Sequence, residues 1–126
     1  MKVLQIVESA YRATIEEQDD TILWLTQAMR GAGADLDVLL RANAVNYAIA
    51  GQDASGLAFG DWTQTQPPNI PDDVARLIGK GVAIYAVAED LADRGLGDAR
   101  MVDGVERVGR ATLPRLMGGY DQIWHW

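Results

Sequence analysis

Two adjacent carboxylates, Glu89 and Asp90, follow an apolar run in the stretch IYAVAEDLADRGL, residues 84–96. The apolar run is typical of a buried strand, and α/β proteins usually bind ligands at the carboxyl ends of their strands. Neighbouring acids at such a place can have different pKa values, which suits general acid–base chemistry. The same residues also suit the first turn of a helix, because carboxylates are favourable near a helix N-terminus. We expect mainly a helix start beside a crevice, with any ligand role secondary.

Three further polar residues follow predicted strands. Tyr11 and Arg12 come shortly after the apolar segment KVLQIV, so they border the same crevice as Glu89 if both strands are central in the sheet. Arg12 could there hold an anionic substrate, whereas the alternative for both residues is a solvated loop. Asn43 follows a second strand, and we expect it to cap the next helix, with crevice lining as its second possible role.

The sequence contains no cysteine and one histidine, His125. Thiol nucleophiles, disulfides and thiolate metal sites are therefore excluded, and we expect no metal site. His125 alternates with Trp124 and Trp126, so its side chain should face away from both indoles, in a structural or interface role. The stretch GAGADLD lacks the G-x-G-x-x-G pattern of a dinucleotide site, and we expect no cofactor.

The charge balance limits the classes of partner. Eleven basic against 18 acidic residues give 11 − 18 = −7, a field that repels nucleic acid and anionic membrane surfaces. The N-terminal apolar run is too short for a signal peptide, and no run approaches the ~20 residues of a membrane helix. We therefore expect a cytoplasmic protein whose 126 residues form a single domain.

Apolar segments alternate with helical patterns along the chain. This alternation predicts an α/β fold: a mostly parallel, doubly wound sheet of about five strands with helices on both faces. The predicted strands are 2–7, 35–40, 84–88, 104–108 and 120–126. The predicted helices begin at 14, 43, 71, 89 and 112.

Local signals define two of these helices and one long loop. Thr14 and Glu17 have capping-box spacing at the start of the first helix, whose Asp20 is expected to face outward. Pro71, followed by two aspartates, begins a helix that closes at Lys80 and Gly81. Residues 52–70 have no periodicity, so we expect a long loop that is functional or mobile.

Two motifs resemble the DsrE/DsrF/DsrH family of small sulfur-relay proteins, which includes the TusB, TusC and TusD subunits. The first is the helix motif from Asn43-Ala44-Val45 to Gly51, and the second runs from Ile84-Tyr85 to Arg94-Gly95-Leu96. Their order and spacing agree with the family over nearly the whole chain. The sequence of the second motif is most similar to that of the TusB/DsrH branch.

The resemblance implies an α/β fold that assembles into trimers or hexamers. It also places the cysteine of sulfur-carrying members at Val87, which is thus expected to line the binding crevice, and a second cysteine of some members at Asp90. Because a persulfide requires a thiol, this chain is expected not to carry sulfur itself. We therefore expect a non-catalytic binding or assembly subunit, a homo-oligomer or a hetero-oligomer with related subunits, whose crevice could also bind a small ligand.

Two other functions remain open at this point. One is a small-molecule-binding protein or an enzyme that uses Glu89 or Asp90 as a proton-transfer base. The other is a pure assembly module whose loop 52–70 docks another protein. Trp62, Trp124 and Trp126 lie in segments that a domain of this size can hardly bury alone, which also predicts an oligomer.

Overall fold

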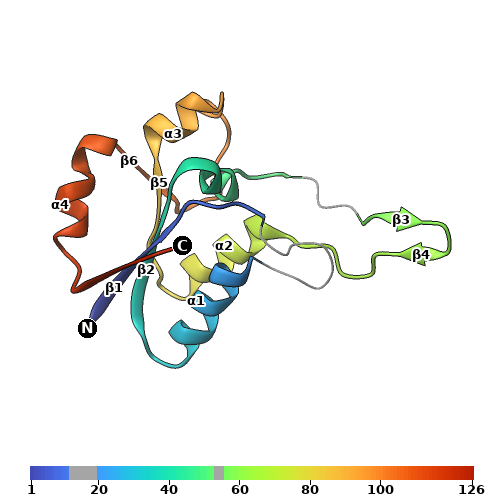
Figure 1. Cartoon of the computed structure of the whole chain (residues 1–126), viewed down its shortest axis with the longest axis horizontal. Helices are drawn as coiled ribbons and strands as arrows, with labels where there is room; N and C mark the ends of the chain where they lie inside the picture. The colour runs from blue at the N-terminus through green and yellow to red at the C-terminus, as the bar shows by residue number, and fades with distance from the viewer. Residues whose placement is uncertain (12–19, 53–55) are drawn as a thin grey trace.

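A parallel five-stranded sheet forms the centre of the protein (Figure 1), in a computed structural model that describes residues 1–11, 20–52 and 56–126. Its strands lie in the order β6-β5-β2-β1-β7, and every neighbouring pair is parallel. The predicted fold class is therefore confirmed. The strands are β1 (Lys2–Val7), β2 (Asp35–Leu40), β5 (Ile84–Val87), β6 (Glu106–Val108) and β7 (Gln122–His125).

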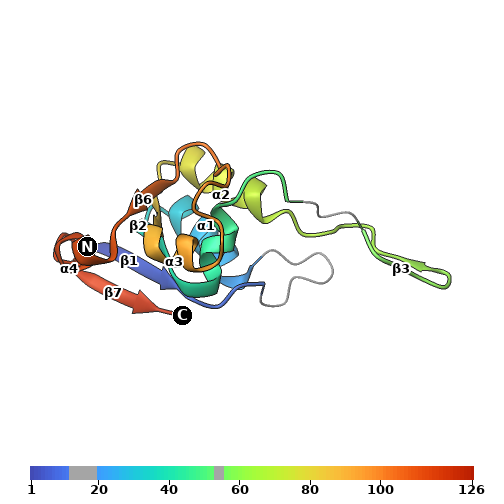
Figure 2. The same ribbon diagram turned by 90° about the horizontal axis from the view of Figure 1, so that it is seen from above.

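Helices cover both faces of this sheet. One face packs against α1 (Thr21–Gly31), α2 (Ile70–Gly79), the 3₁₀ helix η1 (Ala42–Ala48) and α3 (Ala88–Asp93), whose buried side chains share one core cluster. The other face packs against α4 (Leu113–Met117), which follows the short 3₁₀ helix η2 (Arg110–Thr112). Figures 1 and 2 show α4 on the side of the sheet opposite α1 and α2.

The side chains of β1 show why this strand needs cover on both sides. Val3 and Val7 belong to the core beneath α1 and α2, whereas Leu4 and Ile6 belong to the core beneath α4. Successive strand residues point to opposite faces, so a continuous apolar run is what a central parallel strand requires. KVLQIV and DLDVLL carry apolar side chains on both faces, interrupted by the buried polar residues Gln5 and Asp37, and their predicted bounds match β1 and β2.

The start of α1 differs from the sequence-based expectation. Its N-cap is Asp20, whose Oδ1 accepts hydrogen bonds from the backbone N–H groups of Ile22 (2.9 Å) and Leu23 (3.1 Å). Asp20 is fully buried, so the prediction that it faces outward is wrong. The first backbone N–H groups of a helix have no carbonyl acceptor within that helix, and the buried Asp20 carboxylate accepts two of them. The predicted capping box at Thr14 and Glu17 lies outside the described residues.

Two other helices differ from their predicted form by small amounts. α2 begins at Ile70 rather than Pro71, because Asn69 provides the cap by accepting the N–H of Asp72 at 3.2 Å. The segment predicted as a helix from residue 43 is the 3₁₀ helix η1, which ends where Ile49 adopts an extended conformation.

The predicted loop 52–70 contains a small hairpin. Strands β3 (Ala58–Phe59) and β4 (Trp62–Thr63) pair in antiparallel fashion around Gly60 and Asp61. Gly60 has a φ of +57°, a conformation that glycine adopts readily at the first position of a two-residue hairpin loop. The hairpin projects from the body of the protein (Figures 1 and 2).

Candidate functional site

The carboxyl edge of the sheet gathers charged residues from all five strands. Because the strands are parallel, the residues that follow them lie along one edge. They form two clusters, one around Asp90 after β5 and one around Glu8 after β1. The charged groups along this edge are Glu8, Arg41, Glu89, Asp90, Arg110 and His125.

Asp90 joins the ends of three strands. Its side chain is almost buried, and its Oδ2 accepts the backbone N–H of Ala42, after β2, at 2.8 Å. Its Oδ1 accepts a hydrogen bond from the guanidinium of Arg110, after β6, at 2.7 Å. Burial by itself would raise the pKa of Asp90, but these two hydrogen bonds and the positive charges of Arg110 and Arg41 bring the pKa below its usual value.

The Glu89 carboxylate binds the backbone of the same arginine, Arg110. The N–H of Arg110 donates to both carboxylate oxygens of Glu89, at 2.7 and 3.0 Å, and so anchors the start of η2. Both acids lie in the first turn of α3, as expected, but the N-cap of α3 is Val87, which has no side-chain cap. The two carboxylates therefore support the loops after β2 and β6 more directly than they support their own helix.

Asn43 does not cap η1, which corrects the sequence-based expectation. The N-cap of η1 is Arg41, and Asn43 Oδ1 accepts hydrogen bonds from Nε (3.2 Å) and Nη2 (3.0 Å) of Arg94. The Nη1 of Arg94 donates to the carbonyl of Asp90. Asn43 and Arg94 thus fasten η1 to α3, because the chain enters η1 one residue earlier than the sequence pattern predicts.

Ala42 is held in a left-handed conformation, with a φ of +47°. That conformation costs a non-glycine residue about 1–2 kcal/mol in the folded state, a cost that glycine would remove. Glycine also has more freedom in the unfolded state, which lowers stability by about 0.4–1 kcal/mol. Ala42→Gly is therefore expected to raise the free energy of unfolding by about 0.5 kcal/mol. Urea denaturation measures this change, and a lower free energy of unfolding would contradict the strain at Ala42.

Val87 occupies the position at which the family resemblance places the sulfur-carrying cysteine. Its side chain is fully buried in the core beneath α4, with Ile6, Leu39 and Leu113. A group at this position is closed off from solvent by α4. Val87 is therefore part of the core rather than a lining of an open crevice.

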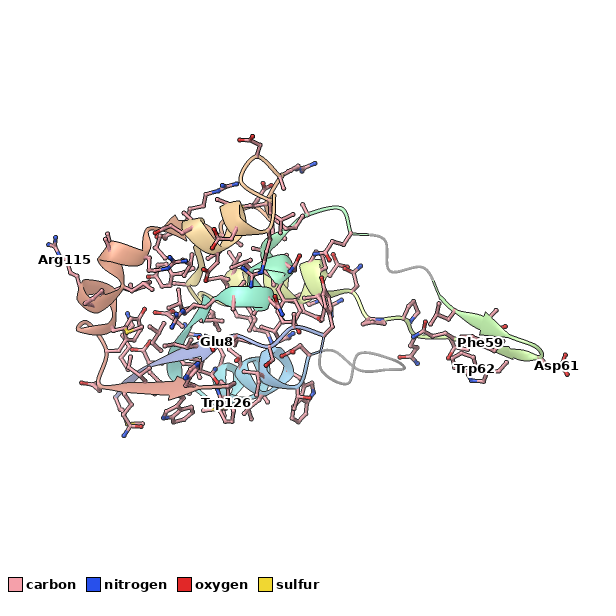
Figure 3. All side chains as sticks on the ribbon, turned by 45° about the horizontal axis from the view of Figure 1, so that its top comes forward. Glu8, Phe59, Asp61, Trp62, Arg115 and Trp126 are labelled. Atoms are coloured by element: carbon pink, nitrogen blue, oxygen red, sulfur yellow. The ribbon has the colours of Figure 1, made fainter. Side chains whose placement is uncertain are left out.

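The second cluster surrounds Glu8. One Glu8 oxygen lies 3.3 Å from Nη1 of Arg41 and the other lies 3.2 Å from Nε2 of His125. β7 follows β6 in the chain but pairs with β1 on the other side of the sheet, so Glu8 stands at the topological switch point. Figure 3 shows Glu8 near Trp126 at this edge. Sequence reasoning missed Glu8 and Arg41, although each directly follows a predicted strand.

Tyr11 lies beside this edge but faces η1. Its hydroxyl donates to Oε1 of Gln52 at 2.7 Å, and its ring meets Tyr47 edge-on, with centroids 5.2 Å apart. The backbone N–H of Tyr11 donates to the Tyr47 hydroxyl, which in turn donates to Asp20. Burial and the neighbouring Asp20 carboxylate raise the pKa of Tyr47. Arg12, the predicted anion-holding residue, lies outside the described residues.

Residues 1–11, 20–52 and 56–126 contain no group of three or more histidine, aspartate or glutamate side chains that could hold a metal ion. Within the same ranges, no helix is long and apolar enough to cross a membrane.

The fold is similar to two solved structures. The YchN protein of E. coli aligns with a TM-score of 0.75 and 20% sequence identity over 99% of this chain and 98% of that chain. A protein of unknown function from Methanobacterium thermoautotrophicum, MTH1491, aligns with a TM-score of 0.62 and 17% identity over 98% and 97%. No protein-family model and no curated protein matches the sequence. At these identities the likeness establishes a shared fold over the whole chain.

Proposed function

We propose that this protein is a cysteine-less relative of the DsrE-like sulfur-relay proteins and acts as a non-catalytic binding or assembly subunit. The observation that carries this proposal is the buried Val87 at the place where the resemblance puts the sulfur-carrying cysteine. The fold shared with YchN and MTH1491 supports the same assignment. With no cysteine anywhere in the sequence, the chain has no thiol to form a persulfide.

The carboxylates at the sheet edge also favour a binding subunit over an acid–base enzyme. Asp90 uses both oxygens in internal hydrogen bonds, and a lowered pKa makes it a weaker base. Glu89 accepts the backbone N–H of Arg110. Both carboxylates are therefore positioned by internal hydrogen bonds, which favours a structural role over proton transfer.

Incubation with a persulfide donor is expected to leave the mass of the protein unchanged. One transferred sulfur atom would add about 32 Da, and only a thiolate would be nucleophilic enough to accept it. Intact-mass spectrometry before and after treatment measures this. A Val87→Cys variant, treated in parallel, tests whether the core position can accept sulfur when a thiol is present there. A stable adduct on the wild-type chain would contradict the proposal.

The assembly role predicts a particle larger than one chain. Several large apolar side chains are exposed, among them Phe59 at 67% and Ile123 at 40% of their surface, which a soluble monomer seldom tolerates together. Light scattering at micromolar concentration is therefore expected to give a multiple of 13.7 kDa. A particle of 13.7 kDa would remove the basis of the assembly role.

A further inference from the structure

The hairpin and its flanking residues, 56–66, form an arm that carries three large exposed apolar side chains. Leu57, Phe59 and Trp62 have 52%, 67% and 44% of their surfaces exposed. The rings of Phe59 and Trp62 stack with centroids 6.0 Å apart. Figure 3 shows both rings on the arm, with Asp61 at its tip. Such a pair of aromatic side chains on a projection is typical of an interface anchor.

The arm is shaped before any partner binds. The N–H of Gln64 donates to the carbonyl of Leu57 at 2.8 Å, and Gln64 Oε1 accepts the N–H of Leu57 at 3.1 Å. The side chain of Gln64 is itself buried. A preformed projection loses less conformational entropy on docking than a disordered segment would.

An apolar groove lies elsewhere on the same molecule, between α1 and the edge strand β7. It has a volume of about 470 Å³ and is lined by Leu25, Trp124, His125 and Trp126. Each indole is held by a hydrogen bond: Nε1–H of Trp124 donates to Gln122 at 3.0 Å, and that of Trp126 donates to Gln5 at 3.2 Å. The groove is large enough to take an aromatic side chain.

We propose that the arm of one copy of this chain docks in the groove of a second copy, with Phe59 and Trp62 packed against Leu25, Trp124 and Trp126. This inference rests on the assembly role proposed above and names the surfaces that carry it. The arm projects away from the body and from Trp126 (Figure 3), so its own groove is not its partner.

The arm and the groove are weakly charged surfaces on an acidic chain. The chain carries a net charge of −7, which makes copies repel one another over most of their surface. Residues 56–66 contain a single charged residue, Asp61, and the groove is lined by apolar side chains and one histidine. The arm and the groove are therefore places where two copies can meet with little like-charge repulsion.

Each copy has one arm and one groove, so this contact is head-to-tail. A head-to-tail contact closes into a ring when its rotation permits, and otherwise produces an open chain. Blocking the arm or the groove should dissociate the assembly, and a chain with a blocked arm should still accept the arm of another.

Light scattering on three variants tests this arrangement. The arm variant is Phe59→Ser with Trp62→Ser, and the groove variant is Leu25→Glu. Each is expected to raise the subunit dissociation constant at least about 30-fold, as the loss of an interface anchor does. Trp24→Ser is the matched control, because Trp24 adjoins Leu25 on α1, is 59% exposed and does not line the groove. Circular dichroism verifies that all three variants remain folded.

Mixing the arm variant with the groove variant gives the decisive result. Only one junction can form in this mixture, between an intact arm and an intact groove, so the expected product is a dimer with one chain of each kind. If wild-type protein is an oligomer and both variants keep its mass, the arm–groove contact is refuted while the proposed assembly role stands. A monomeric wild-type protein would refute both.

Discussion

Asp20→Ala is expected to lower the free energy of unfolding by about 3 kcal/mol, because loss of an N-cap costs about 1 kcal/mol and a stranded buried hydroxyl costs about 1–3 kcal/mol. The fully buried Asp20 carboxylate accepts two amide groups of α1 and, at 2.6 Å, the hydroxyl of Tyr47. Urea denaturation at neutral pH measures the loss.

Asn69→Ala provides the matched control. Asn69 caps α2 through one hydrogen bond at an exposed position, so its replacement is expected to cost about 1 kcal/mol. A double-mutant cycle with Tyr47→Phe isolates the contact between Tyr47 and Asp20. Equal losses in Asp20→Ala and Asn69→Ala, with no coupling in the cycle, would show that Asp20 acts only as a helix cap.

Asp90→Asn is expected to cost about 2 kcal/mol at pH 7, because hydrogen bonds to a charged group contribute more than neutral ones. The lowered pKa of Asp90 sets the pH dependence. In the unfolded state the pKa of an aspartate carboxyl is about 3.9. A carboxyl whose pKa is lower in the folded state stabilises the fold at pH values above about 3.9. This contribution is lost as the pH falls through the folded-state pKa. The difference between wild type and variant should therefore shrink below about pH 4.

The neighbouring Asp93 gives a control for this prediction. Its carboxylate is exposed and lies 3.8 Å from the Arg110 guanidinium, so Asp93→Asn is expected to change the free energy of unfolding by less than about 0.5 kcal/mol. Thermal or urea melts from pH 3 to pH 7 compare the two variants. Unchanged or increased stability in Asp90→Asn, together with a loss of partner or ligand binding, would instead indicate that Asp90 is kept for binding at the expense of stability.

The amino-acid sequence by itself determined the elements whose signals are local. KVLQIV and DLDVLL have apolar side chains on both faces, which predicts central strands, and β1 and β2 have the predicted bounds. α2 is marked by Pro71 and by acidic residues in its first turn, within one residue of its observed start. Periodicity and capping act over a few residues, so the chain alone reveals them.

Local sequence signals for a hairpin turn and for helix caps do not always predict the structure that forms. Gly60 and Asp61 stand between Phe59 and Trp62, a pattern that favours a hairpin, yet the absence of periodicity over 52–70 indicated only a loop. Asp20 and Asn43 are both residue types that cap helices. Asp20 caps α1, whereas Asn43 binds Arg94, and nothing local to either residue distinguishes the two outcomes.

Only the tertiary structure decided which charged groups meet at the carboxyl edge. Glu8 reaches His125, near the other end of the chain, because β7 adds to the sheet beside β1 rather than beside β6. Asp90 reaches Ala42 and Arg110 because β5 lies between β2 and β6. Strand order depends on how whole helices pack over the sheet. Local sequence patterns therefore do not reveal which residues distant in sequence become neighbours.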